Sequence, residues 1–555
     1  MATTTIPAQA AEGNPALTAR VAAVWHVLLA LAGAGVLFTL FQTTWPREWL
    51  RIAALAVVAA WVPLNVYAAV MLVQRKHAGR AFSVILNYLG LTGFVLAALN
   101  AAGVFLGLDV VGDRFRSQVF WLSGVMIGFL IGGVGDSYSH DPSFQRTLHR
   151  IGNGLMLGSI AAMLLLMGAL QGLFFVLTQL LTPNGLLLLA GALLFGLMFW
   201  AVFRPQSAAY FGATSRDSEM LSGYMFIAPN LLGFVLFFAG PLLFSLYLSL
   251  TNSDGFTAAF VGIRNYVDIF SLDFAQLQES GQRASTVLQA RYVELTRFSL
   301  FGSDYIIGAK DKQFWIALGN TAIFCLFTTL LAVVPPLLIA NILNTKIPGM
   351  QFFRAIYFIP SIAGVVGVAV IWKWLYNSNV GFLNYGLSAM VGVLNVIPGL
   401  NLPPPDIAWL SSQQTALLSI IIMAAWQLLG FNTILFLAGL QGIPGEVYEA
   451  AEIDGATGAQ RFRSMTLPLL APTTIFVVTT TLISTLQVFS EVVVMTPPPG
   501  GGPNNATLTS VLYLYQRGFK DFQQGYSAAV AWVLFFFIFL ITLAQLRISR
   551  RYSDA

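Results

Sequence analysis

The chain has 555 residues, of which 57% are hydrophobic and only 9% are charged. Soluble proteins carry about 25% charged residues, so this composition and a mean hydropathy of +0.76 exclude a soluble protein and indicate an integral membrane protein. The net charge of +5 is small for this length; it fits basic cytoplasmic loops and requires no nucleic-acid partner.

Apolar runs long enough to cross the hydrocarbon of a bilayer as a helix recur along almost the whole chain. The sequence therefore predicts an all-α integral membrane fold with about twelve transmembrane helices, surrounded by membrane lipid. We expect them at Val21–Phe41, Ile52–Val73, Phe82–Leu108, Val119–Val134, Ile151–Leu181, Gly185–Phe203, Met225–Leu250, Phe314–Ile342, Ala355–Leu375, Thr415–Leu440, Thr473–Met495 and Tyr526–Leu546. The polar start of the chain and the lack of a small-residue cleavage site make the first run a span, not a cleaved signal.

Basic residues give the expected orientation. An even number of spans puts both termini on one side, and most connections on that side are basic, among them those with Arg75, Lys76, Arg80, Arg146, Arg150, Arg204, Arg216, Arg461 and Arg463. By the positive-inside rule this side is the cytoplasm. The opposite loops also hold some basic residues, and Val119–Val134 is short. If Val119–Val134 did not cross the membrane, the orientation of all the spans before it would be reversed.

Residues 1–222 are expected to form a separate N-terminal bundle of six spans with few polar residues. We interpret this bundle as an accessory scaffold, with regulation or partner docking as the alternative. His26, a lone histidine, is expected at a membrane interface. Cys325 is the only cysteine and is expected to be a small buried hydrophobe, and no Cys/His cluster has the spacing of metal ligands.

Residues 223–555 hold the other six spans and two polar segments. Residues 251–313 are mixed in charge, lie outside in this topology and are too long for a simple connector. They are expected to be either a small exoplasmic subdomain or a disordered loop, and we favour a docking surface.

The second polar segment, Pro444–Leu470, is named the charged hairpin here and is expected in the cytoplasm. Pro444 can begin a helix, Glu446 and Glu449 suit its positive N-terminal end, and the alanines at 450 and 451 favour helix. Gly455 then permits a turn, and Pro468 marks the return to the membrane. The pattern predicts two short helices and a turn forming a rigid projection; a solvated loop is the plainer alternative.

The order of residues in the charged hairpin resembles the "EAA" loop of permease subunits of binding-protein-dependent ABC importers. Glu449-Ala450-Ala451, then Gly455, then Met465-Thr466-Leu467-Pro468 follow that pattern, with Met465 where isoleucine is usual. Further stretches are similar in matching order and favour the larger, maltose-type carbohydrate permease: Phe226-Ile227-Ala228-Pro229, Tyr247 to Thr251, Phe314 to Thr321 and Gly501-Gly502-Pro503. The resemblance covers about residues 222–555. The first six spans and Pro497-Pro498-Pro499 depart from the family pattern.

The resemblance implies that the charged hairpin is a coupling helix held in a cleft of a cytoplasmic ATPase subunit. The expected partners are two ATPase subunits, a second permease subunit and an extracytoplasmic solute-binding protein, in a bacterial cytoplasmic membrane. The chain has no G-x-x-x-x-G-K-[ST] motif; we expect no cofactor and no enzymatic activity on it, with ATP and Mg bound by the partner ATPase. The expected coupling residues are Glu449, Ala450, Ala451, Asp454, Gly455, Arg461, Leu467 and Pro468.

Polar residues in the spans that flank the charged hairpin are candidates for the transport pathway, because polar groups in lipid are costly unless they face a cavity or another helix. They are Gln427, Gly430, Asn432, Thr433, Gln487, Ser490 and Glu491, with Thr485 beside them, and the aromatic rings of Trp426, Phe431 and Phe489 suit a sugar ring. Hydrogen bonding between helices is the alternative role. The expected cargo is a sugar, an oligosaccharide such as maltose, maltodextrin or trehalose.

An ion-coupled secondary sugar carrier is the main rival function. Such carriers need ion-binding groups at membrane depth, and Glu491 is the only carboxylate within an apolar run. A receptor-like membrane protein is a third class, but the chain has no receptor-like cytoplasmic domain. Pro335-Pro336 is expected to break its span, and Pro229, Pro241 and Pro360 to bend theirs, as hinges or static bends.

Overall fold

The computed structural model describes residues 14–45, 48–136, 141–279, 281–344, 350–378, 381–397, 400–498 and 500–553. Within these ranges the helices are joined by turns and loops, and the strands form one small sheet. It divides into two compact units, Met1–Phe234 and Val235–Ala555. A helical segment with the length and apolar character of one membrane span, Ser215–Ser249, runs through the division.

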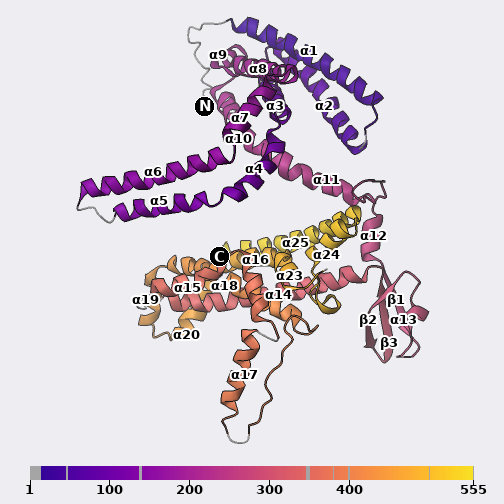
Figure 1. Cartoon of the computed structure of the whole chain (residues 1–555). Helices are drawn as coiled ribbons and strands as arrows, with labels where there is room; N and C mark the ends of the chain where they lie inside the picture. Colours follow the sequence, from indigo (N-terminus) through magenta and orange to yellow (C-terminus); the bar gives the residue numbers. More distant parts are fainter. Residues whose placement is uncertain are drawn as a thin grey trace. The chain divides into compact units, whose positions relative to one another are not determined.

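The first unit is built from helices that pack in pairs: α1 with α2, α3 with α8, and α5 with α6, the last pair side by side in Figure 1. Its helices are α1 (Pro15–Gln42), α2 (Glu48–Val73), α3 (His77–Ala101), α4 (Val104–Gln118), α5 (Trp121–Asp136), α6 (Pro142–Leu166), α7 (Ala169–Leu180), α8 (Pro183–Phe203), α9 (Pro205–Tyr210) and α10 (Ser215–Phe234). Glycines allow the close approach of α3 and α8. A Cβ on Gly90 would lie 2.2 Å from Phe195, and one on Gly191 would lie 2.3 Å from Phe94.

Two predicted spans of the first unit are interrupted by glycines. Gly103 and Gly168 adopt φ of +73° and +81°, a left-handed conformation that ends a helix and that glycine tolerates best. Phe82–Leu108 is therefore divided between α3 and α4, and Ile151–Leu181 between α6 and α7. The expected span Val119–Val134 corresponds to α5, which has 16 residues.

The expectation that His26 is interfacial is wrong, because His26 is fully buried inside the first unit. Its Nδ1 lies 2.7 Å from Asn65 Oδ1 on α2, and its Nε2 lies 2.7 Å from Ser83 Oγ on α3. Asn87 accepts a hydrogen bond from Trp25 Nε1 at 2.9 Å in the same cluster. These polar residues, which are far apart in the sequence, meet where α1, α2 and α3 pack together. Their burial is tolerated because each polar side chain has a hydrogen-bond partner.

The second unit contains α11 (Gly240–Ser249), preceded by a π-helical turn at Val235–Ala239, and the helices that follow the insertion. Those are α14 (Lys312–Leu343), α15 (Met350–Ile362), α16 (Val365–Leu375), α17 (Phe382–Leu394), α18 (Ala416–Gln441), α19 (Gly445–Ile453), α20 (Gly458–Arg461), α21 (Leu467–Leu469), α22 (Ala471–Leu486), α23 (Ser490–Met495), α24 (Ser510–Tyr515) and α25 (Gln524–Ser553), with short η segments at Phe462–Thr466, Pro503–Asn505 and Gln516–Lys520. Pro335 and Pro336 do not break α14, which continues as one helix of 32 residues.

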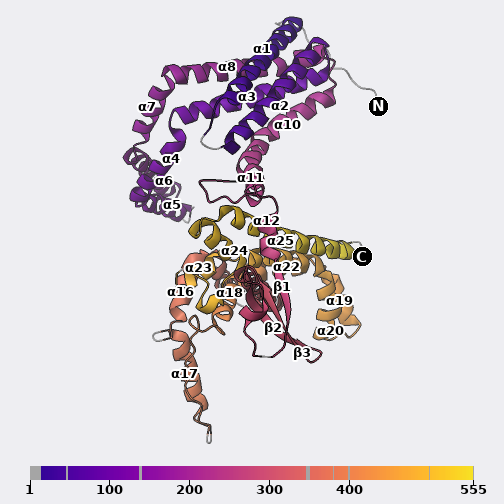
Figure 2. The same ribbon diagram turned by 90° about the vertical axis from the view of Figure 1, so that its right-hand side faces the viewer.

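The insertion, residues 251–313, is folded in its described part rather than disordered. It contains α12 (Arg264–Phe270), β1 (Leu272–Leu277), α13 (Ala284–Val287), β2 (Val293–Leu300) and β3 (Ser303–Ala309). The strands form an antiparallel sheet in the order β1-β3-β2, which is a separate lobe at the right of Figure 1 and lies in front of the helices in Figure 2. Leu277, Leu288 and Ile306 form its small core. Ile306 of β3 is fully buried and Leu277 of β1 is 6% exposed, so the sheet has one covered face.

The core of the second unit places the insertion and the charged hairpin at opposite ends of the helices (Figure 1). The starts of α14 and α18 share one cluster, in which Phe314 and Ile420 are buried. Their ends share another, with Leu343 and Leu440. The two helices are thus parallel. Because β3 leads into the start of α14 and the charged hairpin follows the end of α18, these polar segments are separated by the length of the bundle.

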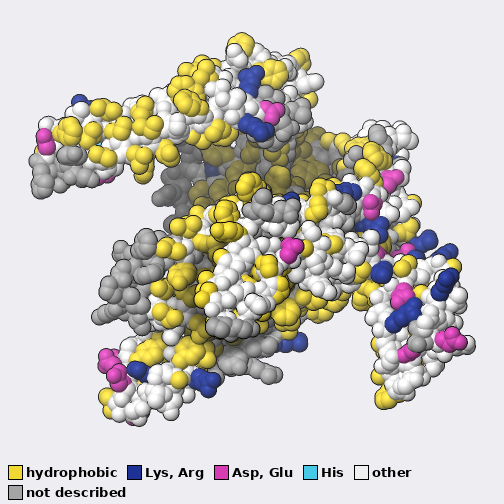
Figure 3. Space-filling view, turned by 60° about the horizontal axis from the view of Figure 1, so that its bottom comes forward, with side chains coloured by type: hydrophobic (Ala, Val, Ile, Leu, Met, Phe, Trp, Pro, Cys, Tyr) yellow, Lys and Arg dark blue, Asp and Glu magenta, His cyan; other side chains and the backbone are white. Residues whose placement is uncertain are grey.

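Among the described residues, nine helices are long and apolar enough to cross a membrane, or eleven if two bent pairs are each one span. The fold is therefore the expected all-α membrane fold, with the sheet as an addition and somewhat fewer spans than about twelve. One bent pair, α15 and α16, turns by 112° at the break near Ala363. Figure 3 shows charged side chains gathered over the insertion and the charged hairpin, with mostly hydrophobic side chains between them.

Candidate functional site

The charged hairpin has the two short helices and the turn that its sequence predicts. Pro444 precedes the first residue of α19, and Glu446 lies in the first turn, where a carboxylate interacts favourably with the helix dipole. After α19, Gly455 has φ of +75°, and Ala456 N donates to Ala451 O at 2.9 Å. This is the usual glycine-terminated helix end, and it turns the chain toward α20.

The charged hairpin is stiffened by local hydrogen bonds and anchored by apolar contacts. Thr457 and Gln460 form a reciprocal capping box at the start of α20. Tyr448 Oη lies 3.1 Å from Thr466 Oγ1, which joins the two arms. Phe462 and Leu467 pack against the cluster at the ends of α14 and α18. The hairpin is consequently connected to the membrane helices by packing as well as by the chain.

The free surface of the charged hairpin combines acidic, basic and apolar groups. Glu449, Asp454 and Arg463 are exposed, while Arg461 Nη1 lies 3.3 Å from Glu452 Oε2. Ile453 is 87% exposed, and a Cβ on Gly455 would meet no other atom within 4 Å. Of the remaining predicted coupling residues, Ala451 is buried, Ala450 and Pro468 are exposed and Leu467 is half-buried. The free surface of the charged hairpin therefore offers charges of both signs and one large apolar side chain.

A cavity of about 250 Å³, named the central cavity here, lies between the membrane helices of the second unit. Of the predicted pathway residues it brings together Gln427 and Glu491, with Thr485 and the ring of Phe431. The other lining residues are Phe324, Ser361, Val365, Ala424, Leu428, Ser484 and Val488. Gln427 Nε2 also donates to Ala363 O at 3.2 Å, which satisfies a carbonyl at the break between α15 and α16.

Three predicted pathway residues on α18 lie in helix packing and do not line the central cavity. Asn432 is buried and donates to Ala332 O at 2.6 Å and to Thr481 Oγ1 at 3.2 Å. Thr433 donates to Leu429 O within its own helix. A Cβ on Gly430 would lie 2.0 Å from Tyr357 O, so this glycine permits α15 to approach α18.

The span that follows the charged hairpin has a break near the other predicted residues. α22 ends at Leu486 and α23 begins at Ser490, and Phe489 between them has φ of −143° and ψ of −59°. Gln487 is exposed and Ser490 is half-buried; neither lines the central cavity. Phe489 packs edge-to-face on Tyr515 at 5.2 Å, and Trp426 packs on Trp372 at 5.5 Å. Of the Pro497-Pro498-Pro499 run, Pro499 lies outside the described residues.

Sequence reasoning missed the lining residues Ser361 and Ser484. Ser361 follows Pro360, a residue already expected to bend its helix, and the break near Ala363 aims it at the central cavity. Ser484 lies in a Ser/Thr-rich stretch, Thr479 to Thr485, whose composition alone does not show which face is lined. Within the described ranges, no group of three His, Cys, Asp or Glu residues is arranged to hold a metal ion.

Comparison with known proteins gives a consistent result for residues 321–554, which match the family described as "Binding-protein-dependent transport system inner membrane component". The chain is 33% identical to the probable ABC transporter permease protein YesP of Bacillus subtilis, over 60% of this chain and 91% of that protein. It is 28% identical to the arabinooligosaccharides transport system permease protein AraP of Bacillus subtilis, over 60% of this chain and 90% of that protein. The solved structure of a bacterial ABC transporter involved in alginate import is 20% identical in sequence. The match covers 59% of this chain and 94% of that chain, with a TM-score of 0.45.

Proposed function

This chain belongs to the family of inner-membrane permease components of binding-protein-dependent transport systems, and from this premise we propose that it moves a sugar across the bacterial cytoplasmic membrane. As a permease subunit of an ABC transporter it is not itself an enzyme. The observation that carries the proposal is the charged hairpin: a stiff polar projection packed onto the ends of α14 and α18, the helices whose residues also form the central cavity.

In the proposed mechanism, an ATPase subunit holds the charged hairpin, and its nucleotide-driven movement is passed to the membrane helices. Phe462 and Leu467 would transmit the movement because they pack on the core at the ends of α14 and α18. Glu449 would pair with a basic residue of the ATPase, and Asp454, Arg461 and Arg463 would set the register. Two ATPase subunits, which bind ATP and Mg, and a second permease subunit complete the proposed assembly.

The proposed orientation has the charged hairpin and both termini in the cytoplasm, which requires that α5, with 16 residues, is a further span beside the eleven candidates. The insertion, at the opposite end of the bundle, would then face the extracytoplasmic solute-binding protein on which the family depends. The abundance of Arg and Lys in the connections on the hairpin's side supports this orientation.

The proposed cargo is an oligosaccharide. The match to AraP covers 90% of that protein, which is named as an arabinooligosaccharides transport system permease protein. The central cavity offers amide, hydroxyl, carboxyl and aromatic groups that suit a sugar. Maltodextrin and trehalose are candidates with arabinooligosaccharides. The cavity's volume of about 250 Å³ is below the ~300–1,000 Å³ of ordinary ligand sites. Transport by alternating access would therefore require it to widen.

The coupling proposal is tested with Glu449→Lys and Gly455→Asp in the assembled transporter. Glu449→Lys reverses the charge offered to the ATPase, and Gly455→Asp adds bulk to a surface that meets nothing within this chain. Both variants should insert and assemble but lose at least about tenfold in sugar uptake. For Glu449→Lys the reason is that a desolvated charge pair at an interface is costly to break; for Gly455→Asp it is that the added side chain would stand between the charged hairpin and the ATPase.

The controls are chosen outside the charged hairpin. Glu219→Lys reverses another exposed carboxylate, and Gly212→Asp adds a side chain at φ of +66° with no neighbour within 4 Å; both should transport normally. Wild-type uptake by the two hairpin variants would overturn the proposal. Uptake that persists without the ATPase and collapses with a protonophore would instead favour an ion-coupled carrier.

A further inference from the structure

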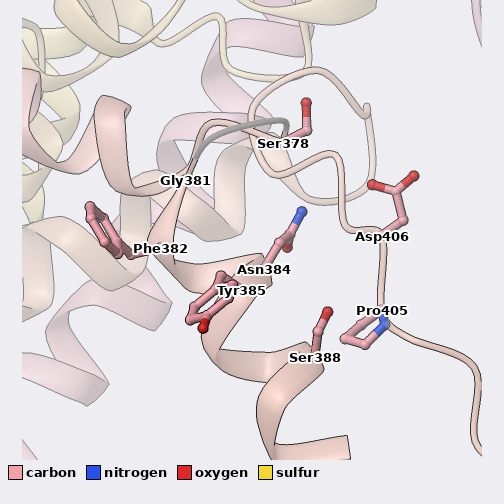
Figure 4. Close-up of a pocket in the computed structure, with 8 residues that line it drawn as sticks. All are labelled: Ser378, Gly381, Phe382, Asn384, Tyr385, Ser388, Pro405 and Asp406. Atoms are coloured by element: carbon pink, nitrogen blue, oxygen red, sulfur yellow. The ribbon is translucent and has the colours of Figure 1, made fainter. Parts of the chain in front are cut away.

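A second cavity, of about 590 Å³, lies outside the site described above, between α17 and the loop that precedes α18 (Figure 4). We name it the outer cavity. Its polar lining consists of Ser378, Asn384, Ser388 and Asp406, and Tyr385 adds an aromatic ring that is 76% exposed. The volume lies within the ~300–1,000 Å³ range of small-molecule sites.

Hydrogen bonds hold the walls of the outer cavity together. Asn384 is 7% exposed; its Nδ2 donates to Ile407 O at 3.1 Å, and its Oδ1 accepts from Trp409 Nε1 at 2.8 Å. These bonds attach α17 to the loop that carries Asp406. In Figure 4, Asn384 and Ser388 point from α17 into the space beside that loop, and the Tyr385 ring lies along the same helix. The cavity is therefore formed before any ligand arrives.

The lining selects a class of ligand. Asp406 has no ion-pair partner among the described residues, and no Lys or Arg lines the outer cavity; an anionic ligand is disfavoured. An apolar ligand would leave the hydroxyl and carboxylate groups unpaired. A neutral polyol satisfies both conditions, since its hydroxyl groups can donate to Asp406 and exchange hydrogen bonds with Ser388, while its C–H face packs on Tyr385.

An adjoining cavity extends this surface. It has a volume of about 640 Å³, shares Ser378 with the outer cavity and is lined by Tyr376, Trp409 and Asn504 among others. Tyr376 is buried in the cluster at the starts of α14 and α18, and Trp409 packs against that cluster. The cavities therefore lie at the end of the bundle away from the charged hairpin, where a chain of several sugar rings would arrive.

We propose that the outer cavity is a carbohydrate-binding subsite, in which Tyr385 contacts the face of a sugar ring and Asp406 accepts its hydroxyl groups. This inference rests on the proposed import of an oligosaccharide. The subsite holds one part of the chain before it enters the central cavity, and it is separate from the residues that line that cavity.

Binding is measured with the complete transporter in nanodiscs, without solute-binding protein or nucleotide, using maltotriose and arabinotriose as probes in titration calorimetry and saturation-transfer NMR. Wild type should bind at least one probe saturably. Tyr385→Ala should weaken that binding about tenfold, Tyr385→Phe should retain it because the ring face remains, and Asp406→Asn should also weaken it. The matched control is Tyr224→Ala, which removes another exposed tyrosine at 65% exposure.

The inference is overturned if neither trisaccharide binds saturably or if Tyr385→Ala binds as tightly as wild type. It is also overturned if Tyr385→Ala changes only the affinity for the solute-binding protein, since the outer cavity would then be a protein-docking surface. Failure of the proposed function is distinguishable, because it would appear as uptake that no longer depends on the ATPase, whatever the binding measured in nanodiscs.

Discussion

Gln427 and Asn432 are both polar residues on α18, yet their surroundings give them different roles. Gln427 lines the central cavity, whereas Asn432 is buried and joins α18 to α14 and α22 through Ala332 and Thr481. The sequence shows only that both residues are amides in an apolar run. Which of them faces a cavity depends on the rotation of α18 against its neighbours, so substitutions should separate the two roles.

Asn432→Ala should destabilise the second unit without changing its affinity for sugar. The variant leaves a buried carbonyl and a buried hydroxyl with one partner fewer, at a cost of about 1–2 kcal/mol. Thermal unfolding of the assembled transporter should begin several degrees lower, while the KM for uptake stays at the wild-type value. A raised KM with unchanged unfolding would contradict the structural role.

Gln427→Ala should show the reverse pattern. Removal of its amide takes a polar group from the central cavity, and the KM for sugar uptake should rise severalfold. The unfolding temperature should be nearly unchanged, because the hydrogen bond from Gln427 to Ala363 O is exposed and water can replace it. Gln487→Ala serves as comparison, because Gln487 is exposed and does not line that cavity. The assignment of Gln427 to the pathway fails if Gln487→Ala raises KM and Gln427→Ala does not.

At the scale of elements, the charged hairpin was predictable because its signals are local. Glycine at the turn, Glu446 in the first turn of α19 and alanines within it all favour the observed conformation. The breaks at Gly103 and Gly168 were missed because glycine is common in membrane helices and often leaves them intact. The error for α14 is the opposite one. Pro335 and Pro336 were expected to break this helix, but it continues through them, because a membrane helix can contain proline when neighbouring groups satisfy the freed carbonyls.

The start of α14 is an element boundary that connects the insertion to the bundle. Asp311 caps α14 by accepting from Phe314 N at 3.0 Å, and it also accepts hydrogen bonds from the hydroxyl groups of Tyr513 and Tyr526. Burial raises the pKa of the Tyr513 hydroxyl above its ordinary value, so this group stays protonated and remains a donor. Arg517 Nε donates to Tyr513 Oη at 2.8 Å.

Asp311→Ala should loosen the attachment of the insertion. It removes a helix cap, worth about 1 kcal/mol, and deprives two tyrosine hydroxyl groups of their acceptor. Limited proteolysis should cut residues 251–313 faster than in wild type. Asp304→Ala, which removes only a contact with Ser299 at the sheet's turn, is the control, and equal cleavage rates in the two variants would contradict this role for Asp311.

At the scale of the whole molecule, the first and second units have separate hydrophobic cores. The composition identified a membrane protein, and the residue order in 222–555 identified its family. The junction of His26 with Asn65 and Ser83 could not be predicted, since those three residues are far apart in sequence and only the packing of α1, α2 and α3 unites them.

The proposed accessory role of the first unit is tested by removing residues 1–214, which leaves the span Ser215–Ser249 whole. The shortened chain keeps the buried clusters of the second unit, so it should still assemble and import sugar at a rate within about twofold of wild type. The comparison is made at equal amounts of assembled transporter. Complete loss of uptake by a fully assembled complex would show that residues 1–214 are required for transport itself.

The central claim is that the charged hairpin lies in the cytoplasm, where a partner ATPase can move it. It is tested by labelling single cysteines with a membrane-impermeant maleimide, in a chain whose one native cysteine, the buried Cys325, is changed to alanine. Gly458→Cys should be labelled in inverted vesicles and protected in right-side-out membranes. Phe301→Cys, at the tip of the insertion and 99% exposed in wild type, should show the opposite pattern. Labelling of Gly458→Cys from the outside would contradict the orientation, the ATPase partner and the transport mechanism together.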